Sequence, residues 1–412
     1  MERFFMSKAL VINFPAEGHI NPTIGVVKEL ANRGEDVVYY CEEEYRFKLK
    51  NVDVQFRNYG GMLEEINLKN RMKDMFNPLQ MMHRFLKTTE RAIPFLLESI
   101  KREQFDYMIY DQHFILGRIL AEILTIPTVA SCTTFAMTKE MLESMKEKFK
   151  ELDVNSALYK ECSTIMTRIS NRYSIKIDSL EELFHYESDM TLVFTSKYFQ
   201  PLSDPFEDNV KFIGPSLINR NEEVNFPLYR LEGKSVIYIS MGTELNKQLE
   251  LYEKCLQAFK DFNGIVVISI GKEIDIMDFG NIPSHFIVRP YVPQLEILKY
   301  AGVFITHGGM NSVSEGLYHD TPLVILPITN DQPFVAKRVE ELNAGVVLNH
   351  QSVTVAELKG AVNTLLNNDS YKEASKFIGQ SLRESGGYNR AADEIFILIN
   401  KTYIIKGLTI LL

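Results

Sequence analysis

The feature that most constrains this chain is an alternation of short apolar runs with amphipathic helical segments. In the first half, apolar residues recur at helical spacing over 22–33 and over 115–124. The apolar runs that we interpret as strands in this half are 9–14, 36–40, 107–110 and 128–131. Strand–helix alternation is typical of a parallel sheet covered by helices on both faces, so we predict an α/β fold.

The same pattern restarts in the second half, where we expect a helix over 249–262. The runs interpreted as strands there are 235–240, 265–270, 286–289, 303–306 and 323–326. Between the halves, residues 214–234 contain Gly-Pro and many Asn and Glu residues, as linkers do. We therefore predict doubly wound domains at 1–216 and 217–390, with 391–412 as a C-terminal helix or tail that can pack back on the first domain.

Composition narrows the possible partners and compartments. The 412 residues carry a net charge of −9, which disfavours nucleic acid because sequence-independent nucleic-acid binders are basic. The four cysteines form no CxxC pair, which argues against a disulfide framework or a zinc site and fits a reducing compartment. The apolar run near the N-terminus is too short for a signal peptide, and the apolar C-terminal tail has about half the length that spans a bilayer. We expect a cytoplasmic protein without stable membrane insertion.

The densest group of polar and glycine residues follows the run 303–306. Glycines at a strand-to-helix turn let a ligand approach the backbone, and the N-terminus of the next helix attracts anions. His307 and Ser312 can donate hydrogen bonds to phosphate oxygens, whereas Glu315, on the same helix face as Ser312, can accept hydrogen bonds from ribose hydroxyls. The pattern favours a nucleoside diphosphate site. The alternative is a simple tight turn followed by a solvated carboxylate.

Two further segments follow strands in the same half. In the first, Tyr291 lies between two prolines and offers a flat face for a base. In the second, Asp331 and Gln332 combine an acceptor with a mixed donor–acceptor, which suits sugar hydroxyls. The alternative for these two residues is N-capping of a helix over 333–342.

A candidate general base lies in the first half. Asn21 is a good N-cap and Pro22 suits the first helical position, which would place His19 just before a helix N-terminus. The positive end of the helix dipole favours the neutral imidazole that a base requires. Asp111 ends another strand on the same sheet edge and could orient His19. The alternative is a surface histidine with an unrelated aspartate.

Several motifs, in order from Gly18 to Gln332, resemble one family. They are Gly18-His19-Ile20-Asn21-Pro22, the segment ending in Asp111, Ser240-Met241-Gly242-Thr243, Tyr291-Val292-Pro293-Gln294, the run from Thr306 to Gly316, and Pro327 to Gln332. With them the chain resembles family 1 UDP-sugar-dependent glycosyltransferases, and most of all the bacterial macrolide and flavonoid type. The resemblance implies the GT-B fold, in which two Rossmann-like domains face each other across a cleft that holds a UDP-sugar.

The resemblance also implies a role for each matched residue. Tyr291 would stack on uracil, with the Val292 backbone reading the base edge, and Gln294 and Glu315 would hold ribose hydroxyls. The diphosphate would be held by Thr243, His307, Gly309, Asn311 and Ser312. Asp331 and Gln332 would hold the donor sugar, and His19 and Asp111 would be the base and its partner. Many relatives carry Trp where this chain, which has no Trp, carries Tyr291.

The expected reaction is a single inverting displacement from a UDP-hexose, glucose first among them, to an acceptor hydroxyl. No divalent metal and no other cofactor is expected, because helix amides and His307 can meet the charge on the leaving diphosphate. Methionines and phenylalanines over 62–85 and 135–149, among them Met137, Met141 and Met145 at helical spacing, indicate either core or an adaptable pocket for hydrophobic acceptors such as flavonoids or macrolides. A lipid or cell-wall glycosyltransferase, a UDP-sugar epimerase-like enzyme and a non-catalytic UDP-sugar-binding module remain alternatives.

Overall fold

The computed structural model divides the chain into two compact units. Unit 1 consists of Met1–Phe194, Leu202–Ser216 and Gly386–Leu412, and unit 2 of Thr195–Pro201 and Leu217–Ser385. The structure describes residues 6–67, 77–177, 179–180, 183, 188–201, 206–218, 225–243, 245–329 and 331–410, without the side chains of 145, 148 and 404–410.

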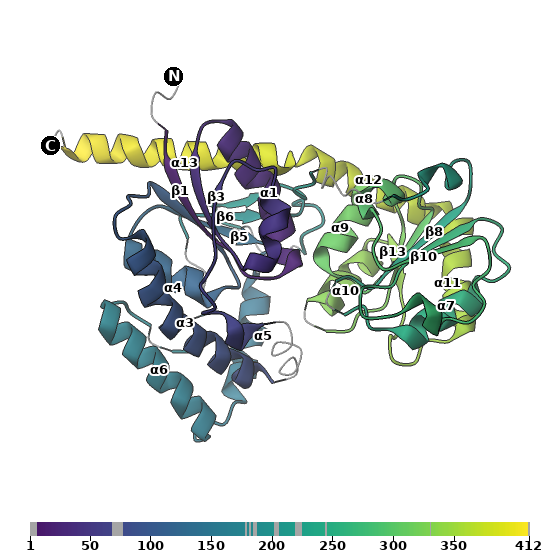
Figure 1. Cartoon of the computed structure of the whole chain (residues 1–412), viewed down its shortest axis with the longest axis horizontal. Coiled ribbons are helices and arrows are strands. Elements are labelled where there is room, and N and C mark those ends of the chain that lie inside the picture. The colour runs from purple at the N-terminus through teal and green to yellow at the C-terminus, as the bar shows by residue number, and fades with distance from the viewer. Residues whose placement is uncertain are drawn as a thin grey trace. The chain divides into compact units, whose positions relative to one another are not determined.

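Unit 1 is built on a parallel sheet whose strands, among the described residues, follow the order β3-β2-β1-β4-β5-β6-β7 (Figure 1). The strands are β1 (Lys8–Ile12), β2 (Asp36–Tyr40), β3 (Gln55–Arg57), β4 (Tyr107–Asp111), β5 (Thr128–Cys132), β6 (Met190–Val193) and β7 (Val210–Phe212). The helices are α1 (Glu17–Asn32), α3 (Pro78–Ile100), α4 (Ile115–Leu124), α5 (Lys139–Lys150), α6 (Ala157–Tyr173) and α13 (Gly387–Ile410), with short 3-10 helices at Glu43–Leu49 and Glu64–Ile66. The strand order reverses direction between β1 and β4, which is where such sheets bind ligands.

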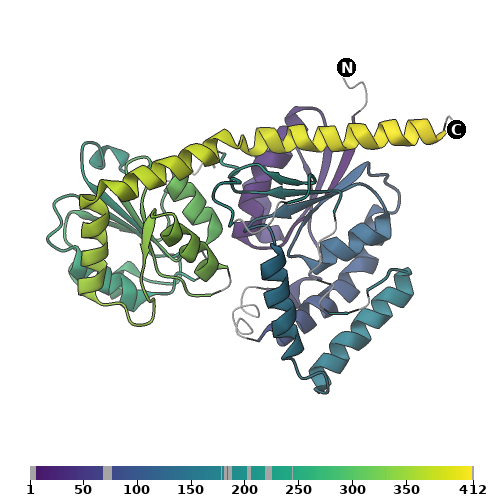
Figure 2. The same cartoon turned by 180° about the vertical axis from the view of Figure 1, so that it is seen from behind.

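Helices cover both faces of this sheet. On one face, α3, α4 and α6 pack on alternate residues of the strands, such as Leu10 and Ile12 of β1. On the other face lie α1 and α13, which contact each other (Figures 1 and 2). The last helix is therefore part of unit 1, although almost 170 residues of unit 2 precede it in the chain.

Unit 2 repeats this architecture with a parallel sheet in the order β10-β9-β8-β11-β12-β13. Its strands are β8 (Val236–Ser240), β9 (Ile265–Ser269), β10 (Phe286–Arg289), β11 (Val303–Thr306), β12 (Leu323–Ile325) and β13 (Gly345–Val347). Its helices are α7 (Leu249–Ala258), α8 (Gln294–Leu298), α9 (Met310–Tyr318), α10 (Gln332–Glu341), α11 (Val355–Asn367) and α12 (Asp369–Glu384), with 3-10 helices at Leu228–Arg230 and Ile276–Asp278. Here the order reverses between β8 and β11. The two sheets confirm the predicted pair of doubly wound α/β sheets.

Two local predictions differ from the structure. Helix α1 begins at Glu17, with Ala16 as its N-cap, so His19 lies in the first helical turn and Pro22 lies inside the helix rather than at its start. The extended backbone of Ala16 lets the helix start one turn early, although Pro22 cannot donate a helical hydrogen bond. Met137 precedes Thr138, the N-cap of α5, and so does not share a helix face with Met141.

Candidate active site

The first polar group of interest surrounds His19, at the carboxyl end of the unit 1 sheet. Strand β1 ends at Ile12, and the side chain of Asn13 then donates a hydrogen bond to the Thr23 hydroxyl (2.8 Å), which ties the strand end to α1. The ring of Phe14 meets the imidazole of His19 edge to face, with centroids 4.8 Å apart. These contacts hold His19 in the first turn of α1.

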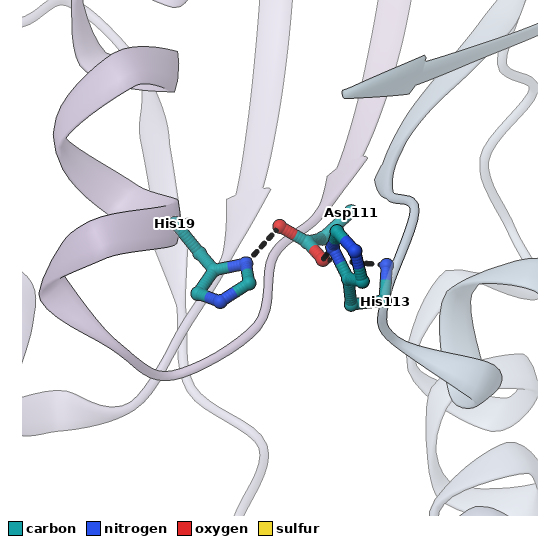
Figure 3. A group of neighbouring side chains, drawn as sticks. All are labelled: His19, Asp111 and His113. Atoms are coloured by element: carbon teal, nitrogen blue, oxygen red, sulfur yellow. Dashed lines mark hydrogen bonds and ion pairs between the residues drawn. The ribbon is translucent and has the colours of Figure 1, made fainter. Parts of the chain in front are cut away.

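Asp111 is the hydrogen-bond partner of His19. It is the last residue of β4, which pairs with β1, and its side chain is fully buried. One carboxylate oxygen lies 2.7 Å from Nδ1 of His19, and the other accepts a hydrogen bond from the backbone N–H of His113 (2.8 Å) (Figure 3). Burial alone would raise the pKa of Asp111, but the adjacent His19, and then His113, hold that pKa below its ordinary value.

This arrangement determines which nitrogen of His19 can act as a base. A carboxylate only accepts hydrogen bonds, so Nδ1 of His19 carries the proton that faces Asp111, and Nε2 keeps the lone pair. The side chain of His19 is 22% exposed, whereas that of Asp111 is shielded completely. A partly exposed imidazole oriented by a buried carboxylate is the geometry of a general base.

Two neighbours of this pair were not singled out from the sequence. The Thr133 hydroxyl, just beyond β5, lies 3.3 Å from Nδ1 of His19. The ring of His113 meets that of His19 edge to face at 5.6 Å, and burial lowers the pKa of His113 to about 4, so it is neutral at pH 7. His113 could have been noticed in the sequence because it lies two residues after Asp111. Nothing in the sequence distinguished Thr133 from the other threonines.

His19, Asp111 and His113 each offer a ligand atom, and these atoms lie within 4.8 Å of one another. One metal ion could bridge atoms so arranged. Both carboxylate oxygens of Asp111 accept hydrogen bonds in this structure, one from Nδ1 of His19 and one from the backbone N–H of His113.

In unit 2, the predicted phosphate residues lie where the sheet order reverses. Gly309 is the N-cap of α9, so Asn311 and Ser312 lie in its first turn, at the positive end of the helix dipole. The ring of His307 fits between two glycines, since a Cβ on Gly242 or on Gly309 would lie 2.6 Å from it. Burial lowers the pKa of His307 to about 4, so the imidazole is neutral at pH 7.

The two predicted ribose residues contact each other. The amide of Gln294, the first residue of α8, donates a hydrogen bond of 2.6 Å to the Glu315 carboxylate, and Glu315 is only 2% exposed. The amide oxygen of Gln294 accepts a hydrogen bond of 2.9 Å from the hydroxyl of Tyr238 on β8. Tyr238 looked like a core residue in the sequence, because it lies within an apolar strand.

The predicted base and sugar residues occupy the remaining loops at this sheet edge. Tyr291 is 41% exposed after β10, as a stacking face must be, and the neighbouring Val292 is buried. Asp331 occupies the N-cap position of α10, as the capping alternative has it, and its side chain makes no capping hydrogen bond. The amide oxygen of Gln332 accepts hydrogen bonds from the backbone of Ile328 and Thr329.

The remaining predictions concern Thr243 and the Met-rich segments 62–85 and 135–149. Thr243 is exposed in the loop after β8, where its carbonyl accepts a hydrogen bond from Asn246. Met82 lies in the core of unit 1, and Met62, Phe85 and Phe149 pack against that core. Met72, Met75 and Phe76, together with the side chain of Met145, lie outside the described residues.

Comparison with known proteins identifies the family. The family model described as UDP-glucoronosyl and UDP-glucosyl transferase matches residues 234–380. The uncharacterized UDP-glucosyltransferase YojK of Bacillus subtilis is 42% identical over 392 residues, which cover 95% of this chain and 97% of the relative. The chain belongs to this family.

Other relatives agree with this assignment over nearly the whole chain. The NDP-glycosyltransferase YjiC of Bacillus subtilis is 32% identical, with 98% of this chain and 100% of the relative covered. The crystal structure of the glycotransferase of kitacinnamycin superposes with a TM-score of 0.84 at 26% identity, covering 95% of this chain and 99% of that one. The protein is therefore a nucleoside-diphosphate-sugar-dependent glycosyltransferase with the GT-B fold. Among the described residues, no helix is long and apolar enough to cross a membrane.

Proposed function

We propose that this enzyme transfers a hexose, preferably glucose, from a UDP-hexose to a hydroxyl of a hydrophobic small molecule, with inversion at the anomeric carbon. Unit 1 would provide the base and the acceptor site, and unit 2 the donor site. The observation that carries the proposal is the hydrogen-bonded pair of His19 and the buried Asp111 in a chain of this family.

The proposed step needs one base and no enzymic nucleophile. Nε2 of His19 takes the proton of the acceptor hydroxyl, the oxygen attacks the anomeric carbon, and the bond from that carbon to the diphosphate oxygen breaks. Asp111 stabilises the imidazolium that forms. The departing diphosphate keeps the electron pair, and its charge is met by the first turn of α9 and by the N–H of His307.

The proposed donor contacts use the loops of unit 2. Tyr291 stacks on uracil above Val292, Gln294 and Glu315 bind the ribose, and Asp331 with the amide nitrogen of Gln332 binds the hexose. Thr243, His307, Gly309, Asn311 and Ser312 would bind the diphosphate, the turn residues through backbone N–H groups.

The acceptor proposal rests on the apolar surroundings of His19. Phe14 contacts His19, and the rings of Phe85 and Phe114 lie 5.8 and 5.5 Å from Phe14. Phe14 and Phe114 are buried, whereas Phe85 is partly exposed, and an exposed aromatic face of this kind favours flat, hydrophobic acceptors.

The test is incubation of the enzyme with UDP-glucose, with and without a panel of polyphenols and macrolides, in buffer containing a chelator. We expect UDP release and glycosylated products with the panel and without added metal. Conversion of UDP-glucose in the absence of acceptor would indicate an epimerase-like enzyme instead. Transfer only to lipid or cell-wall acceptors would contradict the acceptor class.

The base assignment is tested with His19→Ala and Asp111→Asn. We expect each to lower kcat by about 10²–10⁴-fold, the usual contribution of a general base, and to leave UDP affinity within about twofold. Calorimetric titration with UDP checks that the variants are folded and bind donor. Near-normal turnover by His19→Ala would refute the assignment.

A further inference from the structure

The hydrogen-bond chain from Tyr238 through Gln294 to Glu315 links three elements of unit 2: β8, α8 and α9. The phenol oxygen of Tyr238 lies 2.9 Å from Oε1 of Gln294, and Nε2 of Gln294 lies 2.6 Å from Oε2 of Glu315. Tyr238 is 1% exposed, so its hydroxyl is not a ligand-binding group of its own.

The direction of each hydrogen bond follows from the chemistry of the partners. A carboxylate only accepts, so the amide NH₂ of Gln294 must face Glu315 and the amide oxygen must face Tyr238. The phenol of Tyr238 is therefore the donor. This leaves one orientation of the Gln294 amide in which both contacts are satisfied.

The position of the Tyr238 phenol is fixed by packing within the sheet. The ring of Tyr238 stacks on that of Phe304 of β11, with centroids 4.7 Å apart and planes 13° from parallel. Because β8 and β11 are paired central strands, the hydroxyl projects from a rigid part of the sheet. A side chain held this way restrains its partner more than a mobile surface residue would.

We propose that Tyr238 is a positioning residue for ribose recognition: it holds the Gln294 amide so that Gln294 and Glu315 present a fixed donor–acceptor pair to the vicinal hydroxyls of the donor nucleotide. This rests on the proposed role of Gln294 and Glu315 in binding ribose. Tyr238 itself touches no substrate and acts through Gln294.

Titration calorimetry with UDP and with 2′-deoxyuridine diphosphate tests this role. Tyr238→Phe keeps the stacked ring and removes one hydroxyl, so we expect UDP affinity to fall about three- to tenfold, the usual worth of one hydrogen bond. Affinity for 2′-deoxyuridine diphosphate should change less than twofold, because this nucleotide lacks the 2′-hydroxyl and so makes fewer of the contacts that Tyr238 would support. With UDP-glucose, KM should rise by the same factor while kcat stays within twofold.

Two further variants separate positioning from a general structural effect. Tyr107→Phe, which removes a buried phenol bonded to Glu35 in unit 1, is the matched control and should leave both nucleotide affinities unchanged. When Tyr238→Phe is combined with Gln294→Ala, UDP affinity should not fall below that of Gln294→Ala alone, because Tyr238 acts through the Gln294 amide.

The inference would be overturned if Tyr238→Phe lowered the affinity for UDP and for 2′-deoxyuridine diphosphate by the same factor. It would also be overturned if the losses of UDP affinity in Tyr238→Phe and Gln294→Ala were additive in the double variant. If the unsubstituted enzyme bound neither nucleotide, the proposed UDP-sugar donor would fail, and this inference with it. Normal UDP binding with an unchanged ribose preference in Tyr238→Phe would overturn the inference alone.

Discussion

Tyr291 is the residue that we propose to stack on uracil, and it is 41% exposed after β10. Replacement of this stacking face by Tyr291→Ala should weaken UDP binding about 5- to 150-fold, the range for loss of one aromatic–base contact. Tyr291→Trp enlarges the face and should tighten binding. The chain has no other Trp, so quenching of the introduced indole by UDP gives a direct measurement.

The control for this prediction is Tyr300→Ala, which removes another exposed tyrosine of unit 2 and should leave UDP affinity unchanged. If the alanine variants at the two positions behaved alike, Tyr291 would not be the stacking residue.

We expect the partly buried imidazole of His307 to make the free energy of unfolding depend on pH. Burial lowers its pKa from the ordinary 6.5 to about 4. Between these values the unfolded chain binds a proton that the native chain does not, so the free energy of unfolding decreases as the pH falls from 6.5 to 4. In His307→Asn, the free energy of unfolding should decrease less over this pH range. Urea denaturation at several pH values measures it.

In His307→Asn, the free energy of unfolding should still decrease somewhat as the pH falls. Burial also lowers the pKa of His113 to about 4, and this variant retains His113. An unchanged slope in His307→Asn would show that His307 is hydrated in the native protein.

At the residue scale, sequence reasoning singled out side chains in polar or glycine-rich segments but not Tyr238 or Thr133. His19 and Glu315 lie in polar or glycine-rich segments, which attract notice in a soluble chain. Tyr238 lies in an apolar strand, and Thr133 is one of several threonines. Their roles depend on partners 56 and 114 residues away, and such pairings cannot be inferred from local pattern.

At the scale of the element, the turn from β11 to α9 depends on glycine for both conformation and space. Gly308 has a φ of +89°, and a Cβ there would lie 2.6 Å from the side chain of Ile325. Gly308→Ala should lower the free energy of unfolding by about 1–3 kcal/mol, through strain and overpacking. It should also weaken UDP binding, because the turn carries the proposed diphosphate contacts.

Gly360→Ala is the matched control for this turn. Gly360 lies inside α11 with nothing within 4 Å of an added Cβ, so alanine should stabilise the helix by up to about 1 kcal/mol. Denaturation midpoints of the two variants should therefore move in opposite directions. A neutral Gly308→Ala would mean that the turn adjusts without cost.

The central strands were easier to predict than the helix boundaries, whereas β3, β6, β7 and β13 were not predicted. Central parallel strands are buried on both faces, so they appear in the sequence as continuous apolar runs such as 37–40 and 303–305. The start of α1 depends on how Asn13 and Phe14 pack, and Pro22 misled the prediction because it is tolerated one turn inside the helix. The five-residue α8 is too short to show a helical period.

At the scale of the whole molecule, unit 1 is completed by a segment from the far end of the chain. Helix α13 buries Ala391, Ala392, Ile395 and Ile399, and Arg33, the C-cap of α1, forms an ion pair with Asp393. Ile395 is fully buried, whereas Ile397, two residues on, is 48% exposed. The helix should therefore contribute core packing through one face only.

Ile395→Ala should lower the free energy of unfolding by about 2–5 kcal/mol, the cost of a cavity, whereas Ile397→Ala should change it by less than about 0.5 kcal/mol. Urea denaturation followed by circular dichroism measures both. UDP affinity should be unchanged in either variant, because the proposed donor residues all belong to unit 2. Equal, small effects of the two substitutions would show that α13 is an appendage, and that unit 1 is stable without the C-terminal residues.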